Sequence, residues 1–294
     1  MKGCVAKALV LAAGEGTRLR PLTADRPKAL VEINGIPLLE HLLALLHYHG
    51  VREVAINVHY RAQEIVRFAG DGRAWGLRIS YLEEKTLLGS GGTVRALRTF
   101  LSEPFFLIYG DVLTNLDLSY LARRHTEGGG VLTCLLHRVP DPWNKGVAEL
   151  DNEGRIVHFA EKPLQGTGPS DLAAAGIYVA EPAIIAAIPE ETPCDFGATV
   201  VPAVLARGMR VVGEELIPEI YLRDIGTLEE YARAQQDAAL GRVRVLRLPV
   251  MLAGAMEDDR RENCSKPAVT SPNEDFDSQK DQYDRPKLTN RKPD

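Results

Sequence analysis

Closely spaced cysteines are missing from this sequence. Its four cysteines, Cys4, Cys134, Cys194 and Cys264, are scattered through 294 residues. No two of them stand at the short spacing that zinc sites and redox motifs use, so neither kind of site is indicated. Isolated cysteines are typical of reduced thiols, and we expect a cytoplasmic protein.

The chain also lacks an excess of basic residues and a long apolar run. Its net charge is -5, so no broad basic face is available to neutralise a nucleic-acid backbone. No run approaches the roughly 20 apolar residues that span a bilayer. The apolar start of the chain is short and contains Lys7, which favours a buried first strand over a signal peptide. We expect neither nucleic acid nor membrane as a partner.

Short apolar runs and amphipathic segments alternate over the first part of the chain. Strands are expected at 8–13, 54–58, 77–81 and 105–109, and the first of these is a continuous apolar run of the kind found in strands buried in parallel sheets. Helical patterns lie between them at 38–46, 62–68 and 93–99. This alternation predicts an α/β fold with a Rossmann-like, mainly parallel sheet, helices on both faces and ligands at the strand carboxyl ends.

The pattern changes near Val131. Apolar segments at 131–139, 147–150 and 156–161, with a turn at 151–154, predict a small antiparallel section. Further elements are expected, namely helices at 182–188, 197–206 and 227–240 and strands at 174–178, 211 and 221–223.

The composition changes again toward the end of the chain. Large apolar residues almost disappear after Asp258, so that segment buries too little surface to offset its ordering entropy. We predict a folded domain at 1–241 and a disordered tail or linker at 258–294. The short apolar linker between them, 242–257, either docks on the domain or begins a further unit.

The first predicted strand leads into a glycine-rich, cationic loop. Two glycines and three cations follow it within one loop's length: Gly14, Gly16, Arg18, Arg20 and Lys28. In a dinucleotide-binding fingerprint that begins at Gly14, the sixth position would be glycine or alanine, but this chain has Leu19 there. The loop also lacks the Lys-Ser/Thr end of a P-loop. An ordinary strand-to-helix turn with surface arginines is the alternative. Thr17 and the Arg26-Pro-Lys28 segment favour a triphosphate site.

Three later features carry polar groups after predicted strands. The turn Leu88-Gly-Ser-Gly-Gly92 opens a helix, where backbone amides can contact a flat heterocycle; a plain capping loop is the alternative. Asp111 follows the strand 105–109 and would project into the crevice, where a buried carboxylate needs a partner. Asp224 stands before Ile-Gly-Thr, so helix capping is its alternative role.

Five motifs together resemble the signature of the sugar-1-phosphate nucleotidylyltransferases, or NDP-sugar pyrophosphorylases. In chain order they are Leu11-Ala-Ala-Gly-Glu-Gly-Thr-Arg-Leu-Arg-Pro-Leu-Thr23 with Pro27-Lys28, Leu88-Gly-Ser-Gly-Gly-Thr93, Tyr109-Gly-Asp111, Phe159-Ala-Glu-Lys-Pro163 and Asp224-Ile-Gly-Thr-Leu-Glu-Glu-Tyr231. The resemblance covers about residues 5–240. Within the family we favour similarity to the mannose- or heptose-1-phosphate guanylyltransferases.

The resemblance implies roles for individual residues. Nucleotide binding is implied for Leu11, Ala12, Ala13, Gly14, Gly16, Thr17, Arg18, Gly89 and Gly91. Sugar-phosphate binding by the antiparallel section is implied for Gly146, Glu161, Lys162 and Gly176. Asp111 and Asp224 would hold Mg²⁺, which prefers oxygen ligands completed by water and phosphate. The catalytic cations would be Arg18 on the departing pyrophosphate, Lys28 on the reacting phosphates and Lys162 on the sugar phosphate.

The implied reaction converts an NTP and a sugar 1-phosphate into an NDP-sugar and pyrophosphate. GTP with mannose or heptose 1-phosphate is favoured, and UTP or dTTP comes next. Ala174 stands where the family commonly has asparagine, which leaves the sugar open. The alternative is an inactive family member that binds sugar nucleotide and regulates a partner, but Lys28, Asp111 and Asp224 are all present. A second copy of the chain, or a second domain fused or associated through the tail, would be further partners.

Overall fold

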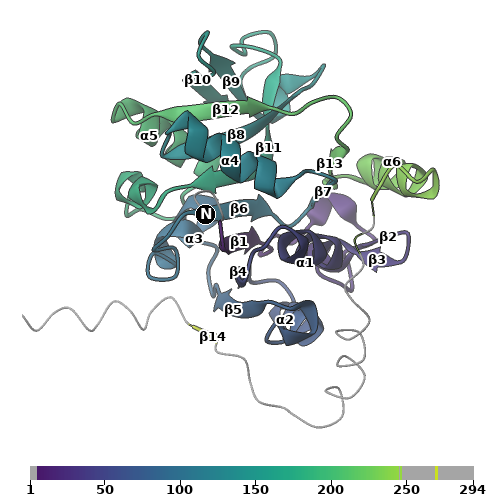
Figure 1. The fold of residues 1–294 in the computed structure, drawn as a ribbon. Coiled ribbons are helices and arrows are strands. Elements are labelled where there is room, and N and C mark those ends of the chain that lie inside the picture. Colours follow the sequence, from purple (N-terminus) through teal and green to yellow (C-terminus); the bar gives the residue numbers. More distant parts are fainter. Residues whose placement is uncertain (1–4, 245, 247–268, 271–294) are drawn as a thin grey trace, which may run out of the picture.

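A mixed sheet of ten strands runs through the protein (Figure 1). The structure, a computed structural model, describes residues 5–244, 246 and 269–270. The strand order is β10-β9-β11-β6-β1-β4-β5-β14, and β8 and β12 extend the sheet from β11. Helices cover both faces of this sheet, so the predicted α/β class is confirmed.

The parallel half of the sheet holds the first strands of the chain. It comprises β1 (Lys7–Leu11), β4 (Glu53–Val58), β5 (Arg78–Glu83) and β6 (Phe105–Tyr109), all mutually parallel where they pair. Each overlaps its predicted segment; β1, β4 and β6 are largely apolar and buried, as parallel strands covered on both faces require, whereas β5 begins with the exposed Arg78. The two-residue β14 (Val269–Thr270) pairs in parallel with β5. The rest of the predicted tail at 258–294 lies outside the described residues.

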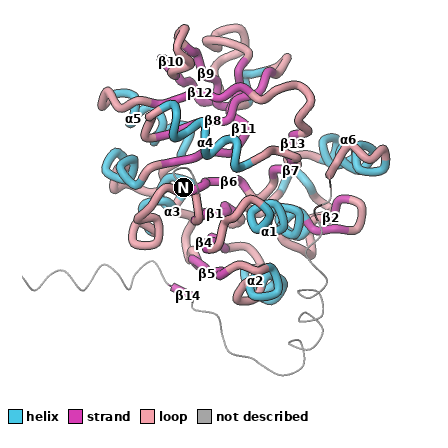
Figure 2. The backbone as a smooth tube through the Cα atoms, viewed as in Figure 1, coloured by secondary structure: helices cyan, strands magenta, loops and turns pink. Residues whose placement is uncertain are grey.

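The antiparallel half contains five strands, drawn in the upper part of Figure 2. They are β8 (Leu132–Arg138), β9 (Gly146–Leu150), β10 (Ile156–Glu161), β11 (Leu172–Ala180) and β12 (Val211–Glu215). As predicted, β9 and β10 form an antiparallel hairpin. Its turn is held by Asp151, whose carboxylate accepts hydrogen bonds from the backbone N–H groups of Glu153 and Arg155. β12 departs from this arrangement by pairing in parallel with β8.

Six α-helices lie in the described part of the chain. They are α1 (Leu38–Tyr48), α2 (Ala62–Ala69), α3 (Gly89–Ala96), α4 (Leu118–Gly128), α5 (Val201–Ala206) and α6 (Leu228–Ala239). A π-helical turn, Phe196–Val200, precedes α5. We predicted no helix at α4, and α3 begins earlier than predicted because its first turn includes the glycines. Not one of the described helices has the length and apolar character that a membrane crossing requires.

Two small ribbons complete the described structure. β2 (Glu32–Ile33) pairs with β3 (Ile36–Pro37), and β7 (Val112–Thr114) pairs with β13 (Leu222–Asp224), both antiparallel. In the second ribbon Val112 stands opposite Asp224, and the backbone N–H of Ile225 donates to the Asp111 carbonyl at 2.9 Å. The β7–β13 ribbon therefore brings the two predicted metal ligands together.

Successive side chains of β1 enter different cores. Ala8 and Val10 pack with α1, α2 and α4, whereas Leu9 packs on the opposite face with α3 and α5. A smaller third core beneath α6 includes Val243 from the predicted linker. Asn115 accepts a hydrogen bond from the Arg244 backbone and donates one to the Arg242 carbonyl. The described start of the linker at 242–257 thus docks on the domain.

Candidate active site

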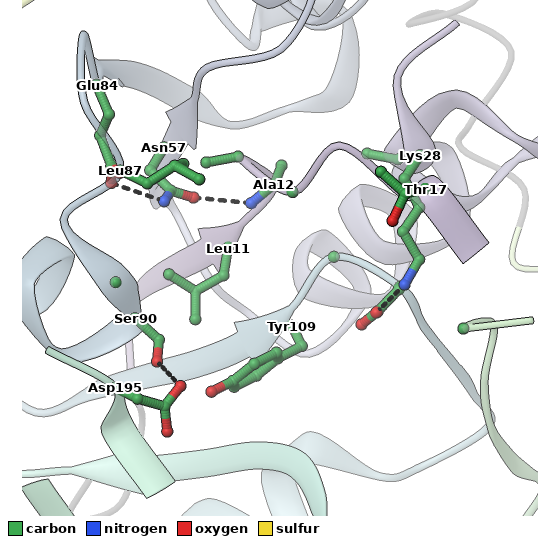
Figure 3. Close-up of a pocket in the computed structure, with 18 of the residues that line it drawn as sticks. Leu11, Ala12, Thr17, Lys28, Asn57, Glu84, Leu87, Ser90, Tyr109 and Asp195 are labelled. Atoms are coloured by element: carbon green, nitrogen blue, oxygen red, sulfur yellow. Dashed lines mark hydrogen bonds and ion pairs between the residues drawn. The ribbon is translucent and has the colours of Figure 1, made fainter. Parts of the chain in front are cut away.

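A cleft of about 400 Å³ opens at the carboxyl ends of β1, β4 and β6 (Figure 3). Most of its lining comes from the first glycine-rich loop, the second glycine-rich turn and the strand ends, and the 28–29 and 195 segments complete it. The lining residues are Leu11, Ala12, Ala13, Gly14, Gly16, Thr17, Arg18, Lys28, Ala29, Asn57, Glu84, Leu87, Gly89, Ser90, Tyr109, Gly110, Asp111, Asp195 and Gly226. Parallel α/β sheets bind ligands at this edge, as the sequence predicted.

The first glycine-rich loop is folded tightly onto the segment that carries Lys28. Gly16 has a φ of 65°, and its carbonyl accepts a 2.7 Å hydrogen bond from the Thr23 hydroxyl. A Cβ at Gly16 would lie 3.0 Å from the Lys28 Cβ. Both the left-handed backbone and the close approach require glycine. Gly16 thereby holds the loop against Lys28 on one wall of the cleft.

A buried polar network joins the two glycine-rich segments (Figure 3). The Asn57 carbonyl oxygen accepts from the Ala12 backbone N–H at 2.7 Å, and its amide donates to Glu84 Oε1 at 2.9 Å. Glu84 Oε2 accepts from the Leu88 backbone N–H at 2.9 Å, and Oε1 accepts from the Thr93 hydroxyl at 2.6 Å. Because buried polar groups are costly when unpaired, this network fixes the two segments relative to each other.

The second glycine-rich turn is anchored by a segment distant in the sequence. The backbone N–H groups of Gly91 and Gly92 donate to the Cys194 carbonyl, at 2.8 and 3.2 Å. A Cβ at Gly89, where φ is 76°, would lie 2.4 Å from that carbonyl oxygen. Gly89 lines the cleft, but Gly91 packs against Val200 and Cys194, outside the lining. The Gly91 and Gly92 amides therefore hold the 194 segment, and Gly89 is the glycine of this turn that faces the cleft.

One end of the cleft is hydroxyl- and carboxylate-rich. The Ser90 hydroxyl donates to Asp195 Oδ2 at 3.0 Å and accepts from the Phe196 backbone N–H at 2.7 Å. The Tyr109 side chain points toward this pair in Figure 3. Burial, together with the charge of Asp195, raises the pKa of Tyr109, so the phenol stays protonated. This end offers hydrogen-bonding groups to an uncharged part of a ligand.

The opposite end concentrates charge around Asp111 and Asp224. Lys28 Nζ pairs with Asp111, and Lys145 Nζ lies 3.7 Å from Asp224 Oδ2. A Cβ at Gly226 would lie 3.2 Å from Asp224 Oδ1 and 3.4 Å from Arg18 Nη2, which places that guanidinium beside the same carboxylate. Three cations thus surround two carboxylates, and the site carries a net positive charge that suits phosphate.

Asp224 is held in an unfavourable environment for a carboxylate. Its Oδ1 is buried and has no hydrogen-bond partner among the described residues. Burial, and next the negative charge of Asp111, raises the pKa of Asp224 despite the cations nearby. Asp224 does not cap α6, because Thr227 does so by accepting from the Glu230 backbone N–H at 3.2 Å. The helix-capping alternative is therefore excluded.

The residues expected to bind the sugar phosphate form a neighbouring group outside the lining of the cleft. A Cβ at Gly146 would lie 2.6 Å from Glu161 Oε2, so glycine leaves room for that carboxylate. Burial and Asp195 raise the pKa of Glu161. Gly176, with a φ of 72°, packs near the Tyr109 ring. Lys162 has a φ of 47°, is 70% exposed and lies 4.0 Å from Glu161.

The structure thus brings most of the predicted residues to one edge of the sheet. The nucleotide residues except Gly91, together with Lys28 and Asp111, line the cleft, and Asp224 adjoins it. Asn57, Glu84, Asp195 and Lys145 were missed. A polar residue inside the apolar run 54–58 was the signal for Asn57, and Lys145 stands directly before a predicted site glycine. The assigned roles stay predictions.

The carboxylate pair fits a divalent cation of the Mg²⁺ type. No three metal-ligating side chains cluster anywhere in residues 5–244. Asp111 and Asp224 offer a pair of carboxylates, and the buried Oδ1 of Asp224 has no partner among the described residues. Such a pair, with cations nearby that can bind phosphate, suits an ion that retains water and takes its remaining ligands from phosphate.

Fold and site together define an α/β protein with a small-molecule cleft whose charged end is built for phosphate. The family model described as nucleotidyl transferase matches residues 7–240. The chain therefore belongs to the nucleotidyl transferase family.

Relatives with named activities are similar over most of this chain. A UTP–glucose-1-phosphate uridylyltransferase of Synechocystis is 31% identical over 83% of the chain and 66% of its own length. A mannose-1-phosphate guanylyltransferase of Mycobacterium tuberculosis is 36% identical over 80% of the chain and 65% of its own length. A glucose-1-phosphate thymidylyltransferase of Streptomyces griseus is 39% identical over 64% of the chain and 52% of its own length. The chain spans less than two thirds of the length of these relatives.

Solved structures share the fold. A Bacillus anthracis structure, assigned as a glucose-1-phosphate thymidylyltransferase in complex with a sucrose, superposes with a TM-score of 0.73 at 24% identity, over 84% of this chain and 98% of that one. HddC from Yersinia pseudotuberculosis, complexed with GMP-PN, gives a TM-score of 0.64 at 25% identity, over 80% of this chain and 100% of that one. The Bacillus structure bears on the fold alone.

Proposed function

We propose that the protein transfers a nucleoside monophosphate from an NTP to a sugar 1-phosphate, releasing pyrophosphate and an NDP-sugar. The observation that carries this proposal is the charged end of the cleft, where Arg18, Lys28 and Lys145 surround Asp111 and Asp224. Two anionic substrates repel each other, so a site that joins them needs an excess of fixed positive charge.

The chemistry needs positioning more than a protein nucleophile. A phosphate oxygen of the sugar 1-phosphate attacks the α-phosphorus of the NTP, and the bond from that phosphorus to the bridging oxygen of pyrophosphate breaks. Lys28 neutralises the reacting phosphates, and Arg18, at the outer end of the glycine-rich loop, holds the departing pyrophosphate. Asp111 and Asp224 would hold Mg²⁺, which would supply further charge neutralisation and orientation. Lys162 approaches the sugar phosphate from the antiparallel section.

The hydroxyl- and carboxylate-rich end of the cleft is assigned to the nucleoside. Glu84 and Asn57 support its inner wall, and Ser90 and Asp195 present polar groups at its rim. We favour GTP with mannose or heptose 1-phosphate, followed by UTP or dTTP with another sugar phosphate. The Mycobacterium tuberculosis relative supports the guanylyl assignment, and the Synechocystis and Streptomyces relatives support the others.

A matrix of substrates tests the proposal. Pyrophosphate release is measured for the four common NTPs and dTTP against glucose, mannose and heptose 1-phosphates, with and without Mg²⁺. We expect metal-dependent turnover with one preferred pair. Folded protein that releases no pyrophosphate with any pair would contradict the enzyme assignment and favour the inactive, regulatory alternative.

A further inference from the structure

Lys145 is the cation at the carboxylate pair that no motif predicts. Its ammonium lies 3.7 Å from Asp224 Oδ2, and its side chain is 27% exposed. On the other side of the carboxylate pair, Lys28 contacts Asp111 and is 14% exposed. Each carboxylate therefore has its own lysine, one from each half of the fold.

The backbone around Lys145 directs its side chain to this position. Lys145 ends a short 3₁₀ turn (Pro142–Asn144) and leads into β9, with its N–H donating to the Pro142 carbonyl at 3.0 Å. Its carbonyl accepts from the Lys162 N–H at 2.9 Å. The two lysines are thus backbone neighbours, yet their side chains diverge: Lys162 is 70% exposed and lies 4.0 Å from Glu161. Of this pair, Lys145 is the one beside the carboxylates.

The two lysines of the carboxylate pair lie beside different groups of predicted site residues. Lys28 and Asp111 line the cleft that opens from the glycine-rich loop, which places Lys28 on the nucleotide side. Lys145 lies outside that lining and directly precedes Gly146, next to the residues expected around the sugar phosphate. A lysine at this place reaches a phosphate that approaches Asp224 from the antiparallel section.

We propose that Lys145, which lies beside Asp224, binds the phosphate group of the acceptor substrate, a sugar 1-phosphate. This inference rests on the proposed function. Before substrates bind, the ammonium is the counter-ion of Asp224. When that carboxylate ligates a divalent cation, like-charge repulsion weakens the 3.7 Å pair, and a phosphate dianion becomes the stronger partner of the ammonium. Lys145 thereby exchanges one anion for the other as the acceptor arrives.

Steady-state kinetics separate this role from a structural one. In Lys145→Met we expect the KM for the sugar 1-phosphate to rise about tenfold to a hundredfold, as for loss of a hydrogen bond between charged groups, with the KM for the NTP changed less than about twofold. Lys145→Arg should recover most of the acceptor affinity, because it keeps the charge. A KM for the sugar 1-phosphate within twofold of wild type in folded Lys145→Met would overturn the proposal, as would an equal rise in both KM values.

Manganese binding tests the same exchange without turnover. Mn²⁺ is titrated into the substrate-free protein and followed by the loss of its free-ion electron paramagnetic resonance signal. Removing the competing ammonium should tighten Mn²⁺ binding several-fold in Lys145→Met, whereas Asp224→Asn should weaken it. Unchanged Mn²⁺ affinity in folded Lys145→Met would overturn the proposed exchange, even if no substrate pair were turned over.

A surface variant controls for the loss of one positive charge. Arg78 is 76% exposed and pairs with Glu53 at 2.8 Å on the β4–β5 side of the sheet. Arg78→Met removes the same charge, and we expect it to leave both KM values and the Mn²⁺ affinity within twofold of wild type. An Arg78→Met variant that reproduces the Lys145→Met effects would overturn the assignment to Lys145, because net charge would then explain them.

Discussion

Replacing Asp224 by asparagine should stabilise the metal-free protein while removing its activity. The buried Oδ1 of Asp224 has no partner among the described residues, and Asp111 repels its charge. Leaving a buried polar atom unpaired costs about 1–3 kcal/mol, and more when the group is charged. Because 45% of the side chain is exposed, solvent screens the charge, and we expect a gain of only about 1 kcal/mol in Asp224→Asn.

The direction of the pH dependence follows from the raised pKa of Asp224. A carboxyl group whose pKa is higher in the folded than in the unfolded state destabilises the folded protein when it is ionised. The penalty is fully present above the raised pKa and is relieved as the pH falls through it. The advantage of Asp224→Asn should therefore be largest near neutral pH and shrink toward pH 4.

Thermal unfolding in EDTA measures this effect. For a domain of this size, about 1 kcal/mol corresponds to about 2–4 °C in melting temperature. Turnover should fall by on the order of 10² or more, as for other lost electrostatic contacts to a reacting phosphate. Asp171→Asn is the matched control, because Asp171 is a surface carboxylate paired with Arg138 and should give no rise. A melting temperature of Asp224→Asn below that of wild type would contradict an unfavourable environment for the Asp224 carboxylate. An advantage over wild type that is as large at pH 4 as at pH 7 would contradict it too.

Three further changes test two residues of the cleft and one of the antiparallel half. Gly89→Ala places a Cβ 2.4 Å from the Cys194 carbonyl oxygen at a left-handed φ, and should cost about 3 kcal/mol in urea unfolding. Asn57→Ala leaves the buried Ala12 N–H unpaired and removes one of the two hydrogen bonds to Glu84 Oε1, and should cost about 3 kcal/mol and raise the KM for the NTP. Burial and then Lys145 lower the pKa of His137 to about 4, so unfolded protein takes up a proton that the folded protein does not below pH 6.5. Wild type should therefore lose up to about 3 kcal/mol relative to His137→Gln between pH 6.5 and 4, measured by urea unfolding.

Each of these changes has a distinct control. Gly14→Ala adds a Cβ that meets no atom within 4 Å, so its urea midpoint should match wild type. If Gly14→Ala destabilised as much as Gly89→Ala, the contact with Cys194 would not be the cause. An Asn57→Ala protein with wild-type stability would argue against the buried network. Parallel pH slopes for wild type and His137→Gln would show that His137 is protonated in the folded state.

The parallel half of the fold was predictable because short apolar segments of the sequence are enough to identify its buried strands. A strand covered on both faces is largely apolar, and the apolar segments at 8–13, 54–58 and 105–109 overlap β1, β4 and β6. The edge at which ligands bind follows from parallel pairing, so the position of Asp111 directly after an apolar run is enough to place it at this edge. α4 was missed, although Asp117 caps it by accepting from the Tyr120 backbone N–H at 3.0 Å.

The rest of the site depends on contacts that sequence spacing does not encode. Asn57 and Glu84 are isolated polar residues in or after apolar strands, and they pair because β4 and β5 are neighbours in register. The Cys194 carbonyl reaches α3 through a loop with no motif of its own. Lys145 could not be assigned, because its partner Asp224 comes from a ribbon far along the chain.

The β7–β13 ribbon also sets the order in which function can appear during synthesis. Asp111 follows β6, whereas Asp224 belongs to one of the last described strands and is locked in place by the packing of α6 over the third core. A growing or truncated chain that ends before β13 can assemble the glycine-rich loop and most of the cleft but holds only one of the two carboxylates. Such a fragment would retain most of the residues expected to bind nucleotide but would lack Asp224. The proposed activity therefore requires the last tenth of the domain.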